Sequence, residues 1–242
     1  MCSPRHGHGA QVMKMRTLNC KLMHRILLYY ITDRKAFAAD EPERRSRVLE
    51  KIGEATQAGV DFIQLREKDL SLRELESLAR EAVGVVRKVR AQNPSSRTAL
   101  LVNSRTDVAL VTGCDGVHLR GEDVSPSEVR RVWESYAEVR TPGSLENPQI
   151  GISCHSPLEV RQAASEGATF AVFAPVFKKE GAQPAGLSAL REACQAKIPV
   201  LALGGVTLEN AELCLQAGAA GIAGIRLFQE HDVAKIVKQL RD

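Results

Sequence analysis

The chain has 242 residues, of which 44% are hydrophobic, 26% charged and only 4% aromatic. The formal net charge of +4 is mild, and with so few rings to stack on bases the composition argues against nucleic-acid binding. A basic mouth for a small anionic substrate is the better use of this charge. No apolar stretch approaches the ~18 residues of a transmembrane helix, so we expect no membrane partner.

Residues 1–25 form a basic segment without any acidic residue. No apolar core follows its basic start, which excludes an ordinary secretory signal. We expect a disordered tail or a translation start placed too far upstream, with a transit-like peptide as the alternative. The cysteines are widely spaced and contain no C-x-x-C pair, so we expect reduced, buried thiols in a cytoplasmic protein rather than disulfides or a zinc site.

From residue 26 onward, short apolar runs alternate with longer segments of helical period. The runs predicted as strands are 26–32, 59–66, 98–103, 115–119, 149–153, 169–176, 198–203 and 219–227. Several are almost continuously apolar, as parallel strands buried on both faces must be. Eight such units predict a single closed (β/α)8 barrel, the TIM barrel, over residues 26–242. An open doubly wound sheet is the alternative, but no G-x-G-x-x-G follows the first strand.

Three of the predicted helices begin with a Ser-x-x-Glu capping box, at Ser71, Ser125 and Ser156. The second and third also have proline at the first helical position, where its missing N–H does no harm. Residues 139–148 are rich in Pro, Gly and Asn and predict an irregular loop. We therefore expect one domain whose helices cover the outside of the sheet.

The segment 61–68 reads Asp-Phe-Ile-Gln-Leu-Arg-Glu-Lys. Side chains of a β-strand alternate between its faces, so Gln64, Arg66 and Lys68 would share one face. An amide, a guanidinium and an ammonium that converge on one space predict a site for an anion. The alternative is an edge strand with a solvated, charged end.

Other polar groups follow the predicted strands, at the edge where a parallel barrel gathers its chemistry. They are Thr32 and Asp33, Asn103 to Arg105, Glu122 and Asp123, Ser153 to His155, Lys178 and Lys179, and Arg226. Gly204 and Gly205, together with Gly224 and Ile225, predict a phosphate site in which backbone N–H groups approach the anion. A helix-entry turn with tight packing is the alternative for the glycine pair.

Motifs in this order resemble those of the thiamine phosphate synthase and TenI superfamily. The matching segments are 30–33 (YITD), 64–68 (QLREK), 103–107 (NSRTD), 115–119 (DGVHL) with Glu122 and Asp123, 151–155 (GISCH), 174–177 (APVF) and 203–206 (LGGV). They run from about residue 26 to about residue 228 in order and with sensible spacing. The ordered set is far more specific than any single motif.

The resemblance implies a transferase that joins a pyrimidine methyl diphosphate to a thiazole phosphate, giving thiamine phosphate and pyrophosphate, with Mg²⁺ as cofactor. Arg66, Lys68 and Ser153 would be catalytic, whereas Asp123 and Ser104 would hold Mg²⁺. The substrate-binding residues would be Gln64, Asn103, His155, Lys178, Lys179, Gly204, Gly205, Gly224, Ile225 and Arg226. The expected partners are small phosphorylated substrates, and a homo-oligomer is an open alternative to a monomer.

Three features depart from the synthase pattern. Ser104 replaces a second magnesium carboxylate, the loop after the sixth strand is shorter and lacks a Thr-x-Thr-Lys element, and Arg226 replaces a serine. One alternative is therefore a metal-independent thiazole tautomerase in which His155 moves the proton. Another is a protein that binds thiamine phosphates without turnover. His118, between two apolar residues, is expected to be buried and hydrogen-bonded rather than a ligand.

Overall fold

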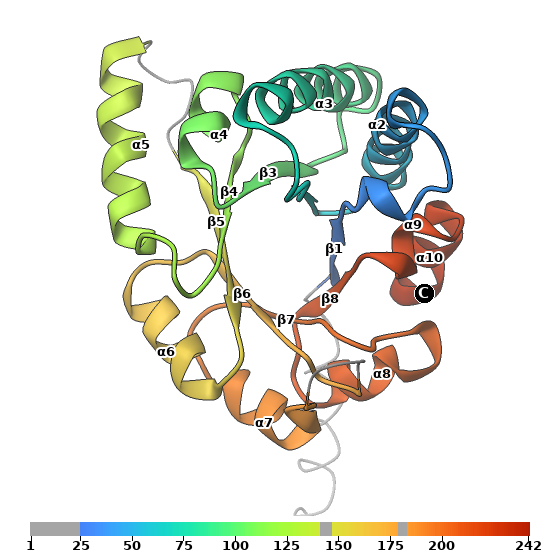
Figure 1. Cartoon of the computed structure of the whole chain (residues 1–242). Coiled ribbons are helices and arrows are strands. Elements are labelled where there is room, and N and C mark those ends of the chain that lie inside the picture. Colours follow the sequence, from blue (N-terminus) through green and yellow to red (C-terminus); the bar gives the residue numbers. More distant parts are fainter. Residues whose placement is uncertain (1–24, 141–146, 179–182) are drawn as a thin grey trace, which may run out of the picture.

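The computed structural model of the chain describes residues 25–140, 147–178 and 183–242. Within them, eight parallel strands form a closed barrel in their order along the chain, and β8 pairs with β1 (Figure 1). The strands are β1 (Leu27–Ile31), β2 (Phe62–Leu65), β3 (Ala99–Asn103), β4 (Gly116–Leu119), β5 (Gln149–Cys154), β6 (Phe170–Phe173), β7 (Val200–Ala202) and β8 (Gly221–Gly224). The predicted (β/α)8 barrel is confirmed.

The helices form a ring around the barrel, as Figure 1 shows. They are the 3-10 helix η1 (Arg34–Ala36) and the α-helices α2 (Glu41–Ala58), α3 (Leu72–Gln92), α4 (Thr106–Thr112), α5 (Pro126–Arg140), α6 (Pro157–Ser165), α7 (Gly186–Ala193), α8 (Leu208–Gln216), α9 (Arg226–Gln229) and α10 (Val233–Arg241). α10 packs against α2, so the last helix of the chain closes the ring beside the first. No helix of the described residues is long and apolar enough to span a membrane.

Two apolar cores lie on the two sides of the barrel wall, because strand side chains alternate between the inside and the outside. The inner core contains Tyr29, Ile31, Leu101, Phe170, Val172 and Leu201, among others. The outer core lies between strands and helices and includes Tyr30, Ile63 and Val102. Burying a large apolar side chain contributes ~1.5–3 kcal/mol, so both layers stabilise the wall that positions the strand ends.

The predicted helix starts are found, with one difference. Ser71 and Glu74 form a full capping box, in which each side chain bonds the other residue's backbone N–H. Ser125 bonds its glutamate in the same way. At α6 the Ser156 hydroxyl accepts from the backbone of Glu159, but the Glu159 carboxylate accepts from the His155 N–H at 2.7 Å. The start of α6 is therefore tied to a predicted site residue.

Two sequence predictions are corrected by the structure. β2 ends at Leu65, so Arg66 lies beyond the strand and Lys68 lies in a turn, not on one extended face with Gln64. The strand ends there because the Arg66 N–H donates to the Thr32 hydroxyl at 3.0 Å instead of to a ladder carbonyl. The loop predicted at 139–148 begins later, since α5 continues to Arg140. Residues 141–146, like residues 1–24 of the predicted tail, lie outside the described residues.

Candidate active site

A chain of hydrogen bonds crosses the barrel interior near the carboxyl ends of the strands. The Gln64 amide donates to Tyr29 Oη at 2.8 Å, and Tyr29 Oη lies 3.1 Å from His118 Nδ1. On the opposite side of the imidazole, His118 Nε2 lies 2.9 Å from Ser153 Oγ. Gln64, Tyr29 and His118 are buried, whereas Ser153 is partly exposed. We call these four residues the polar chain.

The donors and acceptors determine the direction of the polar chain. The Tyr29 oxygen accepts an N–H of Gln64, and His118 Nδ1 is the acceptor within reach of the Tyr29 hydroxyl proton, which assigns the imidazole proton to Nε2. The neutral imidazole then carries its own proton on Nε2 and donates it to Ser153 Oγ. Burial, reinforced by the charge of Arg66, lowers the pKa of His118 to about 3, which keeps the ring neutral. The Ser153 hydroxyl proton is left to donate to a bound molecule.

Gly151 makes room for this arrangement. A Cβ at this position would lie 2.8 Å from His118 Nδ1 and 2.5 Å from the Phe170 ring. Phe170 stacks on Phe62 with ring centroids 4.5 Å apart, and it meets Tyr29 edge-on at 5.4 Å. A packed aromatic layer therefore supports the polar chain, and only glycine at position 151 leaves space for it.

A buried ion pair anchors the loop that carries Arg66 and Lys68. Glu67 accepts hydrogen bonds from Thr32 Oγ1 at 2.6 Å and from the Arg34 N–H at 3.1 Å. The Arg34 guanidinium lies 3.3 Å from the same carboxylate, and both side chains are buried. Burial raises the pKa of Glu67 although these donors oppose it. Arg66 and Lys68 therefore lie on either side of Glu67 in the sequence, and Glu67 is hydrogen-bonded to the loop after β1.

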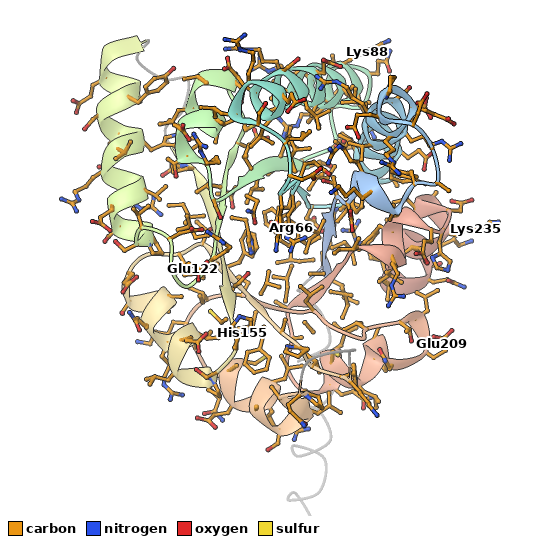
Figure 2. The ribbon with its side chains drawn as sticks, viewed as in Figure 1. Arg66, Lys88, Glu122, His155, Glu209 and Lys235 are labelled. Carbon is orange, nitrogen blue, oxygen red and sulfur yellow. The ribbon has the colours of Figure 1, made fainter. Side chains whose placement is uncertain are left out.

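Arg66 lies toward the middle of the ring of helices, as Figure 2 shows. Lys88, Glu209 and Lys235 lie at the rim of that ring. The positive charge of Arg66 also contributes to the lowered pKa of His118. A guanidinium offers planar, charge-assisted donors that match phosphate oxygens. The barrel mouth therefore combines a cation with a serine hydroxyl.

Asp123, Ser104 and Arg120 form a compact cluster just beyond β3 and β4, which we call the Asp123 cluster. Ser104 Oγ donates to Asp123 Oδ2 at 2.6 Å, and the Arg120 N–H donates to the same oxygen at 2.7 Å. The Arg120 guanidinium bonds Asp123 Oδ1 at 3.1 Å and Ser104 Oγ at 3.0 Å. Although burial opposes them, these donors hold the pKa of Asp123 below its ordinary value. The Asn103 amide also donates to Ser104 Oγ, at 3.1 Å.

The donor set of this cluster does not fit a Mg²⁺ ion held by the protein. Mg²⁺ requires an octahedron of oxygen ligands and is usually bound through one or two carboxylates. The cluster contains one carboxylate, that of Asp123. Both of its oxygens accept hydrogen bonds, and the Arg120 guanidinium offsets its charge. No group of three or more metal-ligating His, Cys, Asp or Glu side chains occurs in the part of the chain that the structure describes.

His155 and the loop after β6 border the same mouth. The His155 Nδ1–H donates to the Ala174 carbonyl at 2.6 Å, so Nε2 is the nitrogen left to accept a proton or a hydrogen bond. Lys178 is exposed and is the last described residue before the gap in that loop. Lys179 lies outside the described residues, so its predicted role is not examined by the structure.

The glycine pair after β7 is required by packing. Gly204 and Gly205 have φ angles of 93° and 67°, in the left-handed region that favours glycine. A Cβ on Gly204 would lie 2.6 Å from Pro175 Cα, and one on Gly205 would lie 2.9 Å from Phe177 Cβ. Close packing against the loop after β6 is sufficient reason for both glycines. The phosphate site that they suggested stays a prediction.

The neighbouring strand supplies the other residues predicted for that phosphate site. Gly224 is the last residue of β8, Ile225 follows it, and the exposed Arg226 begins the four-residue α9. Since β7 pairs with β8, these residues lie at the same end of the barrel as Gly204. Arg226 therefore adds a cation to this side of the mouth.

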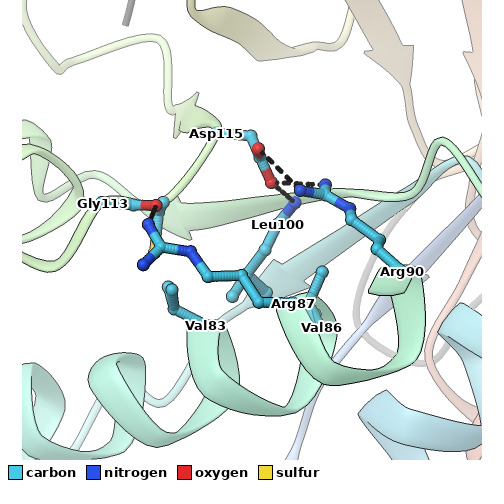
Figure 3. A pocket seen from close by; sticks show the side chains of 8 residues that line it. Val83, Val86, Arg87, Arg90, Leu100, Gly113 and Asp115 are labelled. Carbon is cyan, nitrogen blue, oxygen red and sulfur yellow. Dashed lines mark hydrogen bonds and ion pairs between the residues drawn. The ribbon is translucent and has the colours of Figure 1, made fainter. Parts of the chain in front are cut away.

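A pocket lies at the opposite end of the barrel. Figure 3 shows it between α3 and the beginnings of β3 and β4, with Arg90 paired to Asp115 at 2.8 Å and Arg87 bonded to the Gly113 carbonyl. Asp115 also accepts the Leu100 N–H at 2.8 Å, so these charges fasten the amino ends of the strands. In barrels of this kind that end contributes to stability and the other to chemistry.

Sequence reasoning did not single out Tyr29 or Arg120. Tyr29 could have been found, because it alternates with Ile31 on the inner face of a strand. Arg120 offered a weaker signal, its three-residue separation from Asp123. The expectation that His118 is buried and hydrogen-bonded is confirmed, but its link to Ser153 was not foreseen.

Comparisons with known proteins agree with the fold and the motifs. The family model described as thiamine monophosphate synthase matches residues 28–228. A provisionally named thiamine-phosphate synthase 2 of Aquifex aeolicus is 40% identical over 207 residues, which cover 84% of this chain and 97% of that protein. A thiamine-phosphate synthase of Methanoculleus marisnigri is 37% identical over 194 residues, covering 78% of this chain and 83% of that protein.

Among solved structures, a thiamine phosphate pyrophosphorylase of Pyrococcus furiosus is similar to this chain. It superposes with a TM-score of 0.69 and 30% sequence identity, over 89% of this chain and 94% of that one. The family match covers nearly the whole barrel, from β1 to α9. This chain belongs to the thiamine monophosphate synthase family.

Proposed function

We propose that this protein is a thiamine phosphate synthase, which joins a hydroxymethylpyrimidine diphosphate to a thiazole phosphate. The C–O bond between the pyrimidine methylene and the diphosphate breaks, and its electron pair leaves with pyrophosphate. The lone pair of the thiazole nitrogen then forms the new C–N bond. The observation that supports this best is the polar chain that ends in Ser153 at the mouth of a barrel of this family.

In this proposal Arg66 and Lys68 bind the diphosphate and stabilise the charge that develops on the leaving pyrophosphate. Ser153 donates its remaining hydroxyl proton to a diphosphate oxygen. Gln64 Oε1 is buried and has no hydrogen-bond partner among the described residues. An unpaired buried acceptor is costly, so the exocyclic amino group of the pyrimidine is a fitting donor for it.

The other predicted residues are assigned to the two substrates in the same way. We assign Asn103, His155 and Lys178 to the pyrimidine side, and Gly204, Gly205, Gly224, Ile225 and Arg226 to the thiazole phosphate. Any Mg²⁺ in the reaction would arrive on the diphosphate oxygens, since this ion commonly keeps its waters and binds substrate phosphates. The cytoplasmic location stays a prediction.

The test is a two-substrate assay on the purified chain. The pyrimidine diphosphate and the thiazole phosphate are supplied at saturating concentrations, with and without Mg²⁺, and thiamine phosphate and pyrophosphate are quantified. We expect equal amounts of the two products, and a reaction without protein serves as the control for background condensation. No product above that control in either condition would refute the synthase assignment.

A thiazole tautomerase is the second candidate, and one observation favours it. His155 is held through Nδ1, so its Nε2 could accept a proton from a thiazole carbon. Such an enzyme would exchange a substrate proton with deuterated water without any diphosphate present. We expect no exchange above the rate in buffer; rapid exchange that disappears in His155→Gln would favour the tautomerase.

A further inference from the structure

Arg120 has no assigned role, yet it makes polar contacts on three sides of its guanidinium. Nη2 lies 3.1 Å from Asp123 Oδ1, Nε lies 3.0 Å from Ser104 Oγ, and Nη1 lies 2.8 Å from Glu122 Oε1. Its backbone N–H adds a fourth contact, to Asp123 Oδ2 at 2.7 Å. The side chain of Asp123 is largely buried, whereas that of Glu122 is exposed. The carboxylate that matters here is therefore that of Asp123.

These contacts involve the same oxygens that a metal ion would need. A divalent cation on the Asp123 cluster would have to bind Asp123 Oδ1 and Ser104 Oγ, the two side-chain oxygens that the guanidinium bonds. It would also have to approach the positive charge of Arg120, and like charges a few ångströms apart repel each other, although solvent weakens this repulsion because the Arg120 side chain is 47% exposed. A metal ion that used both of these oxygens would have to displace the Arg120 side chain.

We propose that Arg120 is the resident cation of the Asp123 cluster and excludes divalent metal ions from Asp123 in the free protein. The negative charge of Asp123 is thereby compensated by a side chain of the same protein. The guanidinium lies where a metal-dependent site would hold its ion. The inference deepens the proposed function, because it names the cation of the same site. It also explains how a serine at position 104 is tolerated, since no second carboxylate is needed to hold a metal.

The local backbone suggests a clean way to create the missing site. Ser104 has a φ of 58°, the only positive φ of a non-glycine residue in the described parts of the chain, and its N–H donates to the His118 carbonyl at 2.8 Å. Aspartate adopts this left-handed region more readily than most residues. Ser104→Asp should therefore keep the turn, and combined with Arg120→Ala it would leave two carboxylates and no competing cation.

The experiment titrates Mn²⁺, as a paramagnetic probe for Mg²⁺, into the purified full-length protein without substrates, and follows free Mn²⁺ by electron paramagnetic resonance. The proteins compared are the wild type, Asp123→Asn, Arg120→Ala, the double variant Ser104→Asp/Arg120→Ala, and that double variant with Asp123→Asn. Arg105→Ala is the matched control, because it removes a neighbouring arginine that pairs with Asp107 and not with Asp123. Circular dichroism checks that each variant is folded.

We expect no Mn²⁺ binding at millimolar concentrations in the wild type or in Arg105→Ala. The double variant should bind at least ten times more tightly than the wild-type limit, and Asp123→Asn should abolish that gain. Wild-type binding that Asp123→Asn removes would overturn the proposal. So would a folded Arg120→Ala and a folded double variant that both bind no better than the wild type. Because no turnover is measured, a failed synthase assay and a failed metal titration remain separate results.

Discussion

At the scale of single residues, the polar chain sets the direction in which hydrogen bonds are donated across the site. Each member is held by a neighbour from a different strand, and the Ser153 hydroxyl is the end that faces the mouth. A neutral imidazole carries one proton. It can donate that proton to Ser153 only if the Tyr29 hydroxyl keeps it on Nε2. We therefore assign Tyr29 as a positioning residue, which is buried and acts on the Ser153 proton through His118.

The first prediction follows from that role. Tyr29→Phe removes the donor to His118 Nδ1 and should lower kcat on the order of 10-fold, with little change in KM for the diphosphate. Tyr30→Phe is the matched control, because Tyr30 points outward and donates to Gln229 at 3.0 Å. Steady-state kinetics give the kcat and KM values, and ¹⁵N NMR of His118 reports the tautomer. Equal kinetic losses in both variants would mean that Tyr29 acts only through stability.

The second residue-scale prediction concerns charge at the mouth. Arg66→Met or Lys68→Met should each lower kcat/KM on the order of 10²-fold, because each removes a cation proposed to stabilise the leaving pyrophosphate. Both lie beyond the end of β2 and outside the apolar core, so thermal stability should change little. Lys88→Met, at the exposed rim, is the control for loss of net charge. Near-normal turnover in both site variants would place the diphosphate elsewhere.

At the scale of elements, the loops after β1 and β2 act as one unit. Arg34 is enclosed by Glu67, Asp69 and Glu41, and hydrogen bonds from Arg34 hold the pKa of Asp69 well below its ordinary value. Thr32 joins the two loops, since it donates to Glu67 and accepts from Arg66. The position of Arg66 is therefore set by side chains of the preceding loop as much as by its own strand.

The third prediction tests this unit. Arg34→Met leaves Glu67 buried without its cation and should lower the free energy of unfolding by ~3 kcal/mol, as breaking one side of a buried pair commonly does. Lys35→Met is the control, because Lys35 makes an exposed pair with Asp69 and should cost less than ~1 kcal/mol. Urea unfolding followed by circular dichroism measures both. Similar small losses in the two variants would show that the buried pair does not anchor the loops.

Elements were predictable from the sequence to the extent that they depend on local patterns. Apolar runs and capping boxes lie in neighbouring residues, so the strands and the starts of α3 and α5 were found close to their observed limits. The end of β2 was missed because it depends on Thr32, more than thirty residues earlier in the chain. The Arg120 contact with Ser104 was missed although the predicted barrel places β3 and β4 side by side, because the sequence pattern does not show which way a long side chain beyond a strand end points.

At the scale of the whole molecule, the barrel divides its polar groups between two ends. The amino ends of β3 and β4 are fastened by ion pairs such as Arg90 with Asp115, whereas the carboxyl ends carry the polar chain and the Asp123 cluster. Inside, the aromatic layer of Phe62 and Phe170 separates the site from the rest of the barrel. This closed interior shields His118 from solvent. Protonation of the buried imidazole should therefore destabilise the entire fold.

The last prediction is the pH dependence of that stability. The pKa of His118 falls from 6.5 to about 3 on folding, so between these pH values the unfolded chain binds a proton that the folded chain does not. Stability should therefore decline as the pH falls below about 6.5, with a limiting slope of ~1.4 kcal/mol per pH unit from this group alone. His118→Gln should remove that part of the slope between pH 6 and pH 4, even if it lowers stability at neutral pH. His231→Gln is the matched control for loss of an imidazole, since His231 is exposed and lies outside the polar chain. Urea unfolding at a series of pH values measures all three proteins, and an identical slope in wild type and His118→Gln would contradict a histidine kept neutral by burial.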